Sequence, residues 1–274
     1  LPLLEKDVQW LINAADPNGA YTYTSADGKP LNSYDNSNAQ MATLGVWAGS
    51  RRGVKVPKKY WSLIERYWTD QQQGDGGWNY RASSPGASYG SMTAAGIATL
   101  FICFDELHSR DYIRANSTPA YKPLTDGLKW LGDNYSISEN PVKKNRYYLY
   151  YMYSLERVGL TSGYKYFDGH DWYAEGVAEL LKRQRPDGSW SENHGQTVDT
   201  AFVLLFLARG RNPVLVNKLQ YTGRWNTRPR EMANFTRWVS SSFERTVNWQ
   251  IIDVDAPVHQ WHDAPILYIS GAGA

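Results

Sequence analysis

The sequence has a single cysteine and no long basic or apolar runs, and each of these absences excludes a class of protein. Cys103 has no second cysteine with which to form an internal disulfide or a multi-cysteine zinc site. No run of Lys and Arg exceeds two residues, and 29 basic against 27 acidic residues leave a formal net charge of +2, which argues against nucleic acid as a partner. The longest apolar stretch, residues 94–104, is about half of the roughly 20 residues that a bilayer requires, so we expect no membrane span.

The chain also lacks an initiator Met and a signal segment. It begins at Leu1, and no charged stretch leads into an apolar one near this end. We therefore expect a processed or truncated chain, and we leave the compartment open, with an extracytoplasmic location favoured.

Aromatic side chains are present in excess. They make up 14 % of the 274 residues, with 12 Trp and 20 Tyr. A helical core could be filled with Leu, Ile and Val, so we expect some of these rings to serve a purpose besides packing. A hydrophobic content of 42 % is enough to bury one large core.

Amphipathic segments alternate with apolar ones over the first 210 residues, whereas strand-period alternation is absent there. Before Gln184, the side chains of Val177 and Leu181 share one face of a helix. Residues 200–208 are apolar all the way round, which predicts an inner helix covered on every side. Four pairs of an outer and an inner helix are predicted: 3–14 with 39–48, 58–72 with 92–104, 121–134 with 147–158, and the helix before Gln184 with 200–208. Such alternation is typical of stacked helical-pair repeats.

The pattern changes after Gly210. We expect a coil over residues 225–230, a helix over 231–243, and short extended runs at 249–254 and 265–271. We therefore divide the chain into a helical-repeat domain, 1–245, and a segment, 246–274, that is a linker and the start of a truncated α/β domain. The rest of that domain would belong to the parent protein and would be a partner of the helical part.

Two near-identical turns follow predicted helices. One is Gln71-Gln72-Gln73-Gly74-Asp75-Gly76-Gly77-Trp78, and the other is Gln184-Arg185-Pro186-Asp187-Gly188-Ser189-Trp190. The glycines can supply the positive φ that ends a helix, Asp187 can cap the next one, and the Trp can stack on the Gln. These turns resemble the QW repeat of the squalene cyclase and protein prenyltransferase superfamily. The resemblance implies an all-α fold, an α/α toroid with a short C-terminal extended segment. Fewer than six helical pairs are visible, so an incomplete ring is left open.

A second resemblance covers about the last half of the chain. It is similar to a bacterial family, frequent in planctomycetes, in which such a toroid precedes a C-terminal domain of unknown function. The resemblance implies a longer parent protein and transfers no catalytic residue. It rests on residues 146–150, 155–159, 199–202, 205–210, 217–219, 225–226, 228–230, 248–250 and 263–271.

Known cyclase and metal motifs are missing. The Asp-x-Asp-Asp motif that protonates an alkene is absent, and its nearest counterpart, Asp253-Val254-Asp255-Ala256, lacks the third Asp. No two Asp residues are adjacent, which argues against a diphosphate-ionising Mg²⁺ site.

Two other groups of residues offer the right types for a metal ion. Cys103 and Asp105, near His108, would point about 200° apart on a helix, so Cys103 is expected to be a buried structural residue. His259, His262 and Asp263 are expected to be solvated polar residues. We predict no metal and no cofactor.

Polar and aromatic residues precede each inner helix. In a toroid the N-termini of the inner helices meet at one end, so we expect these residues to line the mouth of a central cavity. The catalytic candidates are His194, Asp199, Arg146 and Tyr147, and the ligand-binding candidates are Tyr34, Asp35, Asn38, Tyr89, Ser91 and Tyr150. The competing interpretation is helix capping, for which Asp35, Asn38, Ser91 and Asn145 are suitable.

Three functions remain open from the sequence. The first is binding of, or catalysis on, a small hydrophobic or isoprenoid ligand in an aromatic cavity, where π-faces can stabilise a cation. The second is a carbohydrate-active toroid such as a polysaccharide lyase, in which Tyr, His, Asn and Arg act on a uronic acid. The third is a non-catalytic scaffold.

Overall fold

The computed structural model describes residues 2–84, 86–108, 121–208 and 212–271. About half of the chain is helical, as the sequence predicts. Two compact units are present: unit 1 comprises Leu1–His108 and Lys122–Asn134, and unit 2 comprises the rest of the chain.

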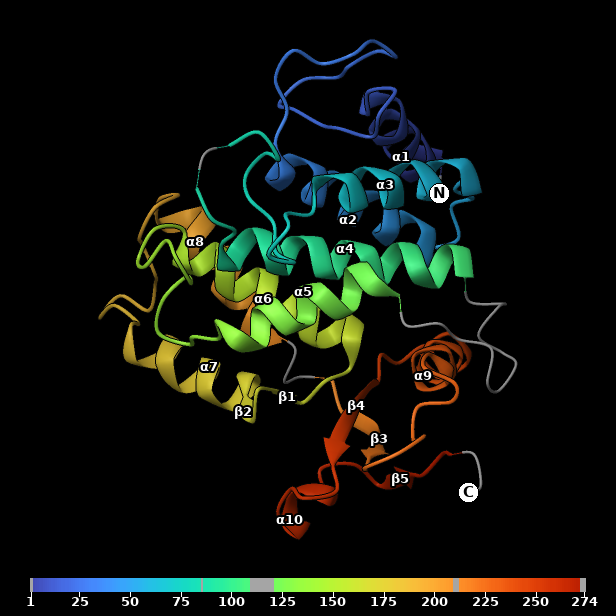
Figure 1. The fold of residues 1–274 in the computed structure, drawn as a ribbon, viewed down its shortest axis with the longest axis vertical. Coiled ribbons are helices and arrows are strands. Elements are labelled where there is room, and N and C mark those ends of the chain that lie inside the picture. Colours follow the sequence, from blue (N-terminus) through green and yellow to red (C-terminus); the bar gives the residue numbers. More distant parts are fainter. Residues whose placement is uncertain (1, 85, 109–120, 209–211, 272–274) are drawn as a thin grey trace. The chain divides into compact units, whose positions relative to one another are not determined.

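Unit 1 is built around one buried helix. Its helices are α1 (Pro2–Ala14), α2 (Asn36–Arg51), α3 (Lys58–Gln71), α4 (Gly90–His108) and α5 (Lys122–Asp133). Helix α4 packs against α2, α3 and α5, and lies between α3 and α5 in Figure 1. By length and composition α4 could cross a membrane, but most of it is buried inside the fold. An apolar surface on every side of a helix is what such a core position requires.

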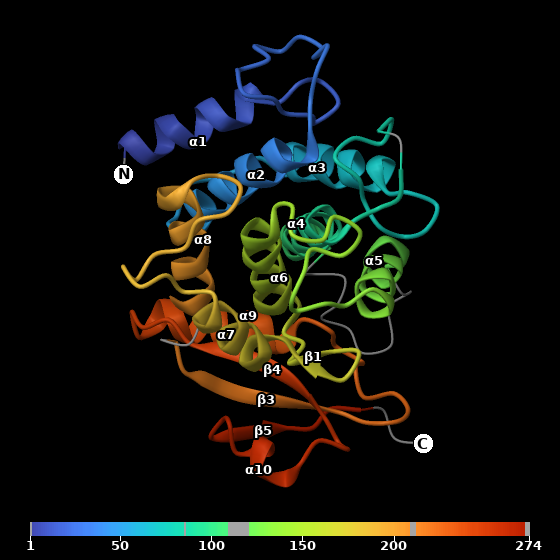
Figure 2. The ribbon, with the colours of Figure 1, turned by 90° about the vertical axis from the view of Figure 1, so that its left-hand side faces the viewer.

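Two helices of unit 2 pack on α6 (Tyr148–Ser162), which is buried along nearly its whole length. Helices α7 (Trp172–Lys182) and α8 (Gln196–Ala208) both contact it (Figure 2). A small hairpin, β1 (Tyr166–Phe167) with β2 (His170–Asp171), leads into α7. Its two turn residues, Asp168 and Gly169, have φ values of 50° and 81°, the doubly left-handed backbone of a tight hairpin turn.

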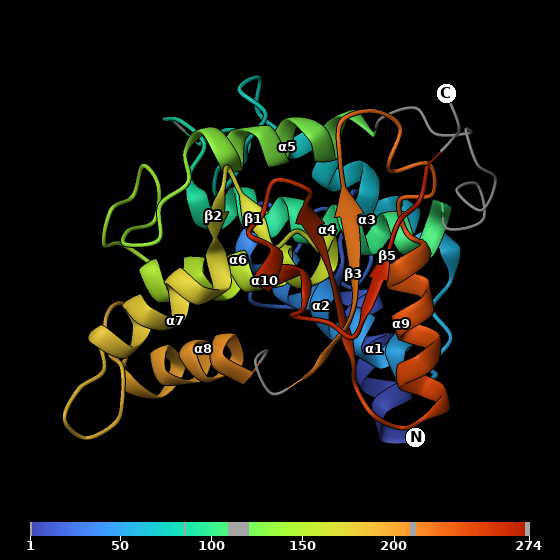
Figure 3. The same ribbon diagram turned by 90° about the horizontal axis from the view of Figure 1, so that it is seen from below.

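The C-terminal part of unit 2 is a parallel sheet. Strand β3 (Val214–Gln220) lies between β4 (Asn248–Asp253) and β5 (Ile266–Tyr268), with the short helix α10 (Val258–Trp261) before β5. Helix α9 (Glu231–Ser242) connects β3 to β4 and packs beside the sheet (Figure 3). Val216, Met232, Trp249 and Ile251 form the core between them.

Most predicted helices are present, but three features differ from the sequence analysis. Strand β3 and the hairpin were not predicted, and the sheet pairs residues 214–220 with strands beyond residue 246. Because β3 belongs to the sheet, a domain that contains the whole sheet would begin before residue 246. The predicted boundary between a helical domain, 1–245, and a second segment, 246–274, stays a prediction. The prediction that residues 200–208 are covered on every side is wrong, because α8 packs mainly on α6 and exposes its opposite face. Arg209 and Gly210, which contribute to the family resemblance, lie outside the described residues.

The two Gln-to-Trp turns are held by the same hydrogen bonds. The indoles of Trp78 and Trp190 donate to the carbonyls of Trp68 and Leu180, ten residues earlier, at 2.8 and 2.7 Å. Gln72 and Gln184 donate to the carbonyls of Gly76 and Gly188, whose φ values are 89° and 82°. Asp75 and Asp187 each accept from the backbone two residues on. One turn joins α3 to α4 and the other joins α7 to α8.

Candidate functional site

An aromatic cluster lies where α6 and α8 begin. It consists of Tyr147, Tyr150, Tyr153, His194 and Phe202. The imidazole of His194 lies 5.5 Å from the ring of Tyr147 and 5.8 Å from that of Phe202, centre to centre. Phe202 also contacts Tyr150 and Tyr153, at 5.6 and 5.2 Å. These separations are typical of aromatic pairs that stabilise one another. Two loops and two helices therefore meet at one group of rings.

Asp199 organises the polar side of this cluster. The residue is fully buried, and its Oδ2 accepts hydrogen bonds from the backbone N–H groups of Glu192 and His194, at 2.6 and 3.3 Å. Its Oδ1 lies 3.4 Å from Nδ1 of His194 and makes no hydrogen bond to a described residue. The pair places a buried carboxylate next to an imidazole, and these are residue types that acid–base chemistry uses.

The carboxylate of Asp199 also affects a neighbour. Burial raises the pKa of Glu192, and the nearby negative charge of Asp199 adds to this, while hydrogen bonding to Arg183 opposes it. Glu192 accepts from Arg183 at 3.2 Å. Glu192, in the loop before α8, is therefore bound by Arg183 through its side chain and by Asp199 through its backbone N–H.

Tyr147 occupies a strained position beside a cation. Its φ of 59° and ψ of 32° are left-handed, which a residue with a side chain rarely adopts. Its backbone N–H donates to Oδ1 of Asn193, and this bond ties the loop before α6 to the loop before α8. The guanidinium of Arg146 lies 5.6 Å from the Tyr147 ring centre. Strain of this kind gathers at functional sites, where the surroundings hold it in place.

The candidates in unit 1 serve local structure. Asp35 caps α2, where its carboxylate accepts from the backbone and the amide of Asn38 at 2.9 and 2.8 Å. The carbonyl of Tyr34 accepts from Arg81. Tyr89 is buried and donates its N–H to the carbonyl of Trp78, and Ser91 is buried as well. Capping accounts for Asp35 and Asn38, as the competing interpretation has it.

Within unit 2 the predicted residues are close together. Contacts link Arg146 to Tyr147, Tyr147 to His194, and His194 to Asp199, and Tyr150 joins the same cluster. Convergence of these residues with Tyr34, Asp35 and Tyr89 on one mouth remains a prediction, since those three belong to unit 1.

The residues considered for a metal are occupied otherwise. Cys103 is buried, as predicted, and burial raises its pKa well above the ordinary value of a thiol. The imidazole of His108 pairs with Glu65 at 2.8 Å, and Asp263 pairs with Lys165. Among the described residues, no group of three or more His, Cys, Asp and Glu side chains could hold a metal ion.

One half of this surface was not predicted from the sequence. Helix α8 exposes a face formed by Val198, Ala201, Leu204, Leu205 and Ala208, all apolar. Phe202 lies beside Val198 and Leu205 on the helix, so the aromatic cluster continues into this apolar face. An all-apolar pattern did not distinguish a covered helix from one with an exposed face.

No family model matches the chain, and no curated protein matches it.

Proposed function

We propose that the helical part is a toroid of the terpenoid cyclase and prenyltransferase type that binds a hydrophobic or isoprenoid ligand. The ligand would lie on the aromatic cluster and along the exposed face of α8. The proposal rests on the exposure of this apolar face of α8. The side chains of Leu204 and Leu205 are 55 % and 46 % exposed, and that of Val198 is 44 % exposed. A contiguous apolar surface on a helix marks a place where something apolar binds.

The cluster gives the apolar face a polar end. Arg146 supplies a positive charge, and the N-termini of α6 and α8 add the partial positive charge of the helix dipole. An isoprenoid with a polar or anionic head would place its head near Arg146 and its tail along Leu205. We propose binding of the ligand, not a reaction of it. If the ligand reacts, we assign proton transfer to the His194–Asp199 pair.

A titration of the purified chain with farnesol and geranylgeraniol tests the proposal, read out as displacement of the fluorescent probe anilinonaphthalene sulfonate. Leu205→Gln should weaken binding of both alcohols by about tenfold, the contribution of a well-buried leucine. Leu181→Gln is the matched control, because Leu181 is 53 % exposed on α7 and is not part of the cluster. Equal affinity in both variants, or no binding to the wild-type chain, would rule the proposal out.

A carbohydrate-active function is the second candidate. It is favoured by the grouping of Arg146, Tyr147 and the His194–Asp199 pair with Asn193, the residue types that bind and deprotonate a uronic acid. Incubation with polygalacturonate and alginate tests it through the ultraviolet absorbance of the unsaturated product. If neither activity nor ligand binding is found, the non-catalytic scaffold is the function left.

A further inference from the structure

A separate cavity lies elsewhere in unit 2, between the start of α7 and the parallel sheet. Its volume is about 240 Å³, and its polar lining comes from Lys165, Asp171, Gln250 and Asp263, beside the ring of Tyr173. Lys165 is held at the sheet edge, because its backbone N–H donates to the carbonyl of Ile251 in β4 at 3.1 Å. The cavity shares no lining residue with the aromatic cluster.

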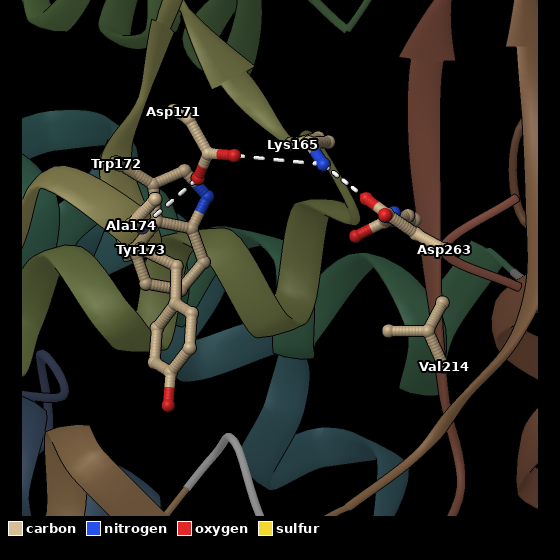
Figure 4. A pocket seen from close by; sticks show the side chains of 8 residues that line it. Lys165, Asp171, Trp172, Tyr173, Ala174, Val214 and Asp263 are labelled. Carbon is tan, nitrogen blue, oxygen red and sulfur yellow. Dashed lines mark hydrogen bonds and ion pairs between the residues drawn. The ribbon is translucent and has the colours of Figure 1, made fainter. Parts of the chain in front are cut away.

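The charges in this cavity do not cancel. The ammonium of Lys165 lies between two carboxylates, 3.5 Å from Asp171 and in direct contact with Asp263 (Figure 4). Asp171 also caps α7 by accepting from the N–H of Ala174 at 3.0 Å. One positive and two negative groups leave a formal charge of −1. An ammonium has three N–H donors, and the one hydrogen bond that Lys165 makes to a carboxylate goes to Asp263.

Gln250 brings a buried donor that has no partner. The residue is 4 % exposed and lines the cavity, and its Nε2 makes no hydrogen bond to any described residue. Asn217, its neighbour in the β3–β4 register, is also buried and has an Oδ1 without a partner. Buried polar groups in native proteins almost always have a partner, either protein, water or ligand. An acceptor inside the cavity would satisfy Gln250.

From this arrangement we infer that the cavity binds a neutral, hydroxyl-rich ligand the size of one sugar ring. A hydroxyl both donates and accepts, so two adjacent hydroxyls can donate to Asp263 and accept from Lys165 and Gln250. An anion would face two carboxylates, and a simple cation would have to displace the ammonium of Lys165 that already lies between them. An apolar ligand would leave Gln250 without a partner. The volume is below the roughly 300 to 1,000 Å³ of pockets for drug-sized molecules, which limits the ligand to a single ring.

Saturation-transfer NMR on the full chain tests this inference. The probes are glucose, galactose, mannose and myo-inositol, with glucuronate and glucosamine as charged counterparts. We expect at least one neutral probe to receive saturation and to bind at least tenfold more tightly than its charged counterparts. No transfer to any neutral probe, the result for a cavity filled only with water, would overturn the inference, and so would equal binding of the charged sugars.

Two variants connect binding to the cavity. Gln250→Met keeps the volume and removes the donor, so it should weaken binding of the neutral probe about tenfold, the worth of one hydrogen bond. If that variant fails to fold, Asp263→Asn, at a more exposed position, should give the same loss. Gln260→Met is the matched control, since Gln260 carries a partnerless Oε1 but does not line the cavity. Unchanged binding in Gln250→Met and Asp263→Asn would refute the site. Leu205→Gln should leave sugar binding intact, which separates this site from the proposed isoprenoid site.

Discussion

Trp190 donates its indole N–H to the carbonyl oxygen of Leu180 across 2.7 Å, and this bond joins the end of α7 to the turn that leads into α8. The ring is buried, so the bond forms out of reach of water. Trp78 makes the equivalent bond to Trp68 at 2.8 Å. The two turns are therefore stabilised by the same device although they lie in different units.

Removing the indole N–H should destabilise the fold. Trp190→Phe loses one buried hydrogen bond and leaves a small cavity, so we expect the free energy of unfolding to fall by about 1 to 3 kcal/mol in urea titrations. Trp238→Phe serves as control, because Trp238 is 61 % exposed on α9 and its loss should cost less than about 0.5 kcal/mol. Similar costs for the two variants would contradict the role given to the Trp190 bond.

The glycines of the two turns should respond differently to alanine. Both have positive φ, which costs an alanine about 1 to 2 kcal/mol. A Cβ at Gly188 would meet only the Gln184 amide at 3.9 Å, whereas a Cβ at Gly76 would lie 2.9 Å from the carbonyl oxygen of Asp126. Gly76→Ala should therefore lower the free energy of unfolding by about 1 to 3 kcal/mol more than Gly188→Ala. Equal losses in urea titrations would show that packing against α5 does not matter.

Substitutions of Tyr147 should weaken ligand binding more than they lower the stability of the fold. Replacing it with glycine relieves the left-handed strain but removes the ring beside His194 and Arg146. We expect Tyr147→Gly to change the free energy of unfolding by no more than about 1 kcal/mol and to weaken farnesol binding about tenfold. Tyr147→Ala should lose binding equally while unfolding more easily than the glycine variant. Full binding in either variant would remove Tyr147 from the proposed site.

Alkaline pH should destabilise the protein through Tyr21. Burial raises the pKa of Tyr21 to about 12 from an ordinary value of 10.0, while its hydrogen bond to Tyr60 at 3.0 Å opposes the rise. Between these pH values the unfolded chain loses the proton and the folded chain keeps it. Stability from this group is complete below pH 10 and falls as the pH rises towards 12. Tyr21→Phe should flatten the decline of the unfolding free energy over this window, and an unchanged slope would refute the assignment.

The helices were predictable because their apolar periodicity is local information. The segment that became α4 is mostly apolar, the segment that became α6 is rich in aromatic side chains, and both are buried. The strand over residues 214–220 was not predictable in the same way. It contains the polar Asn217 and Lys218, and Lys218 is buried only because Glu231 and Asn226 bind its ammonium. Such pairing depends on how residues 8 and 13 positions further on fold back over the strand, which a pattern search does not see.

The candidate site was predictable in part. Helix starts that carry His194, Asp199, Arg146 and Tyr147 do meet within unit 2, because α6 and α8 pack side by side. The cavity around Lys165 was not found, since Lys165, Gln250 and Asp263 are 85 and 13 residues apart in sequence. They meet only when residues 163–165 pair with β4. A single buried lysine carries no motif by which it could have been recognised.

The surface that we propose for a hydrophobic or isoprenoid ligand lies on unit 2. Native mass spectrometry of the purified chain, before and after addition of geranylgeraniol, tests it most directly. We expect a peak for a one-to-one complex that is strong in the wild-type chain and in Leu181→Gln but weak in Leu205→Gln. A spectrum that shows only the unliganded chain at every concentration of geranylgeraniol would contradict it.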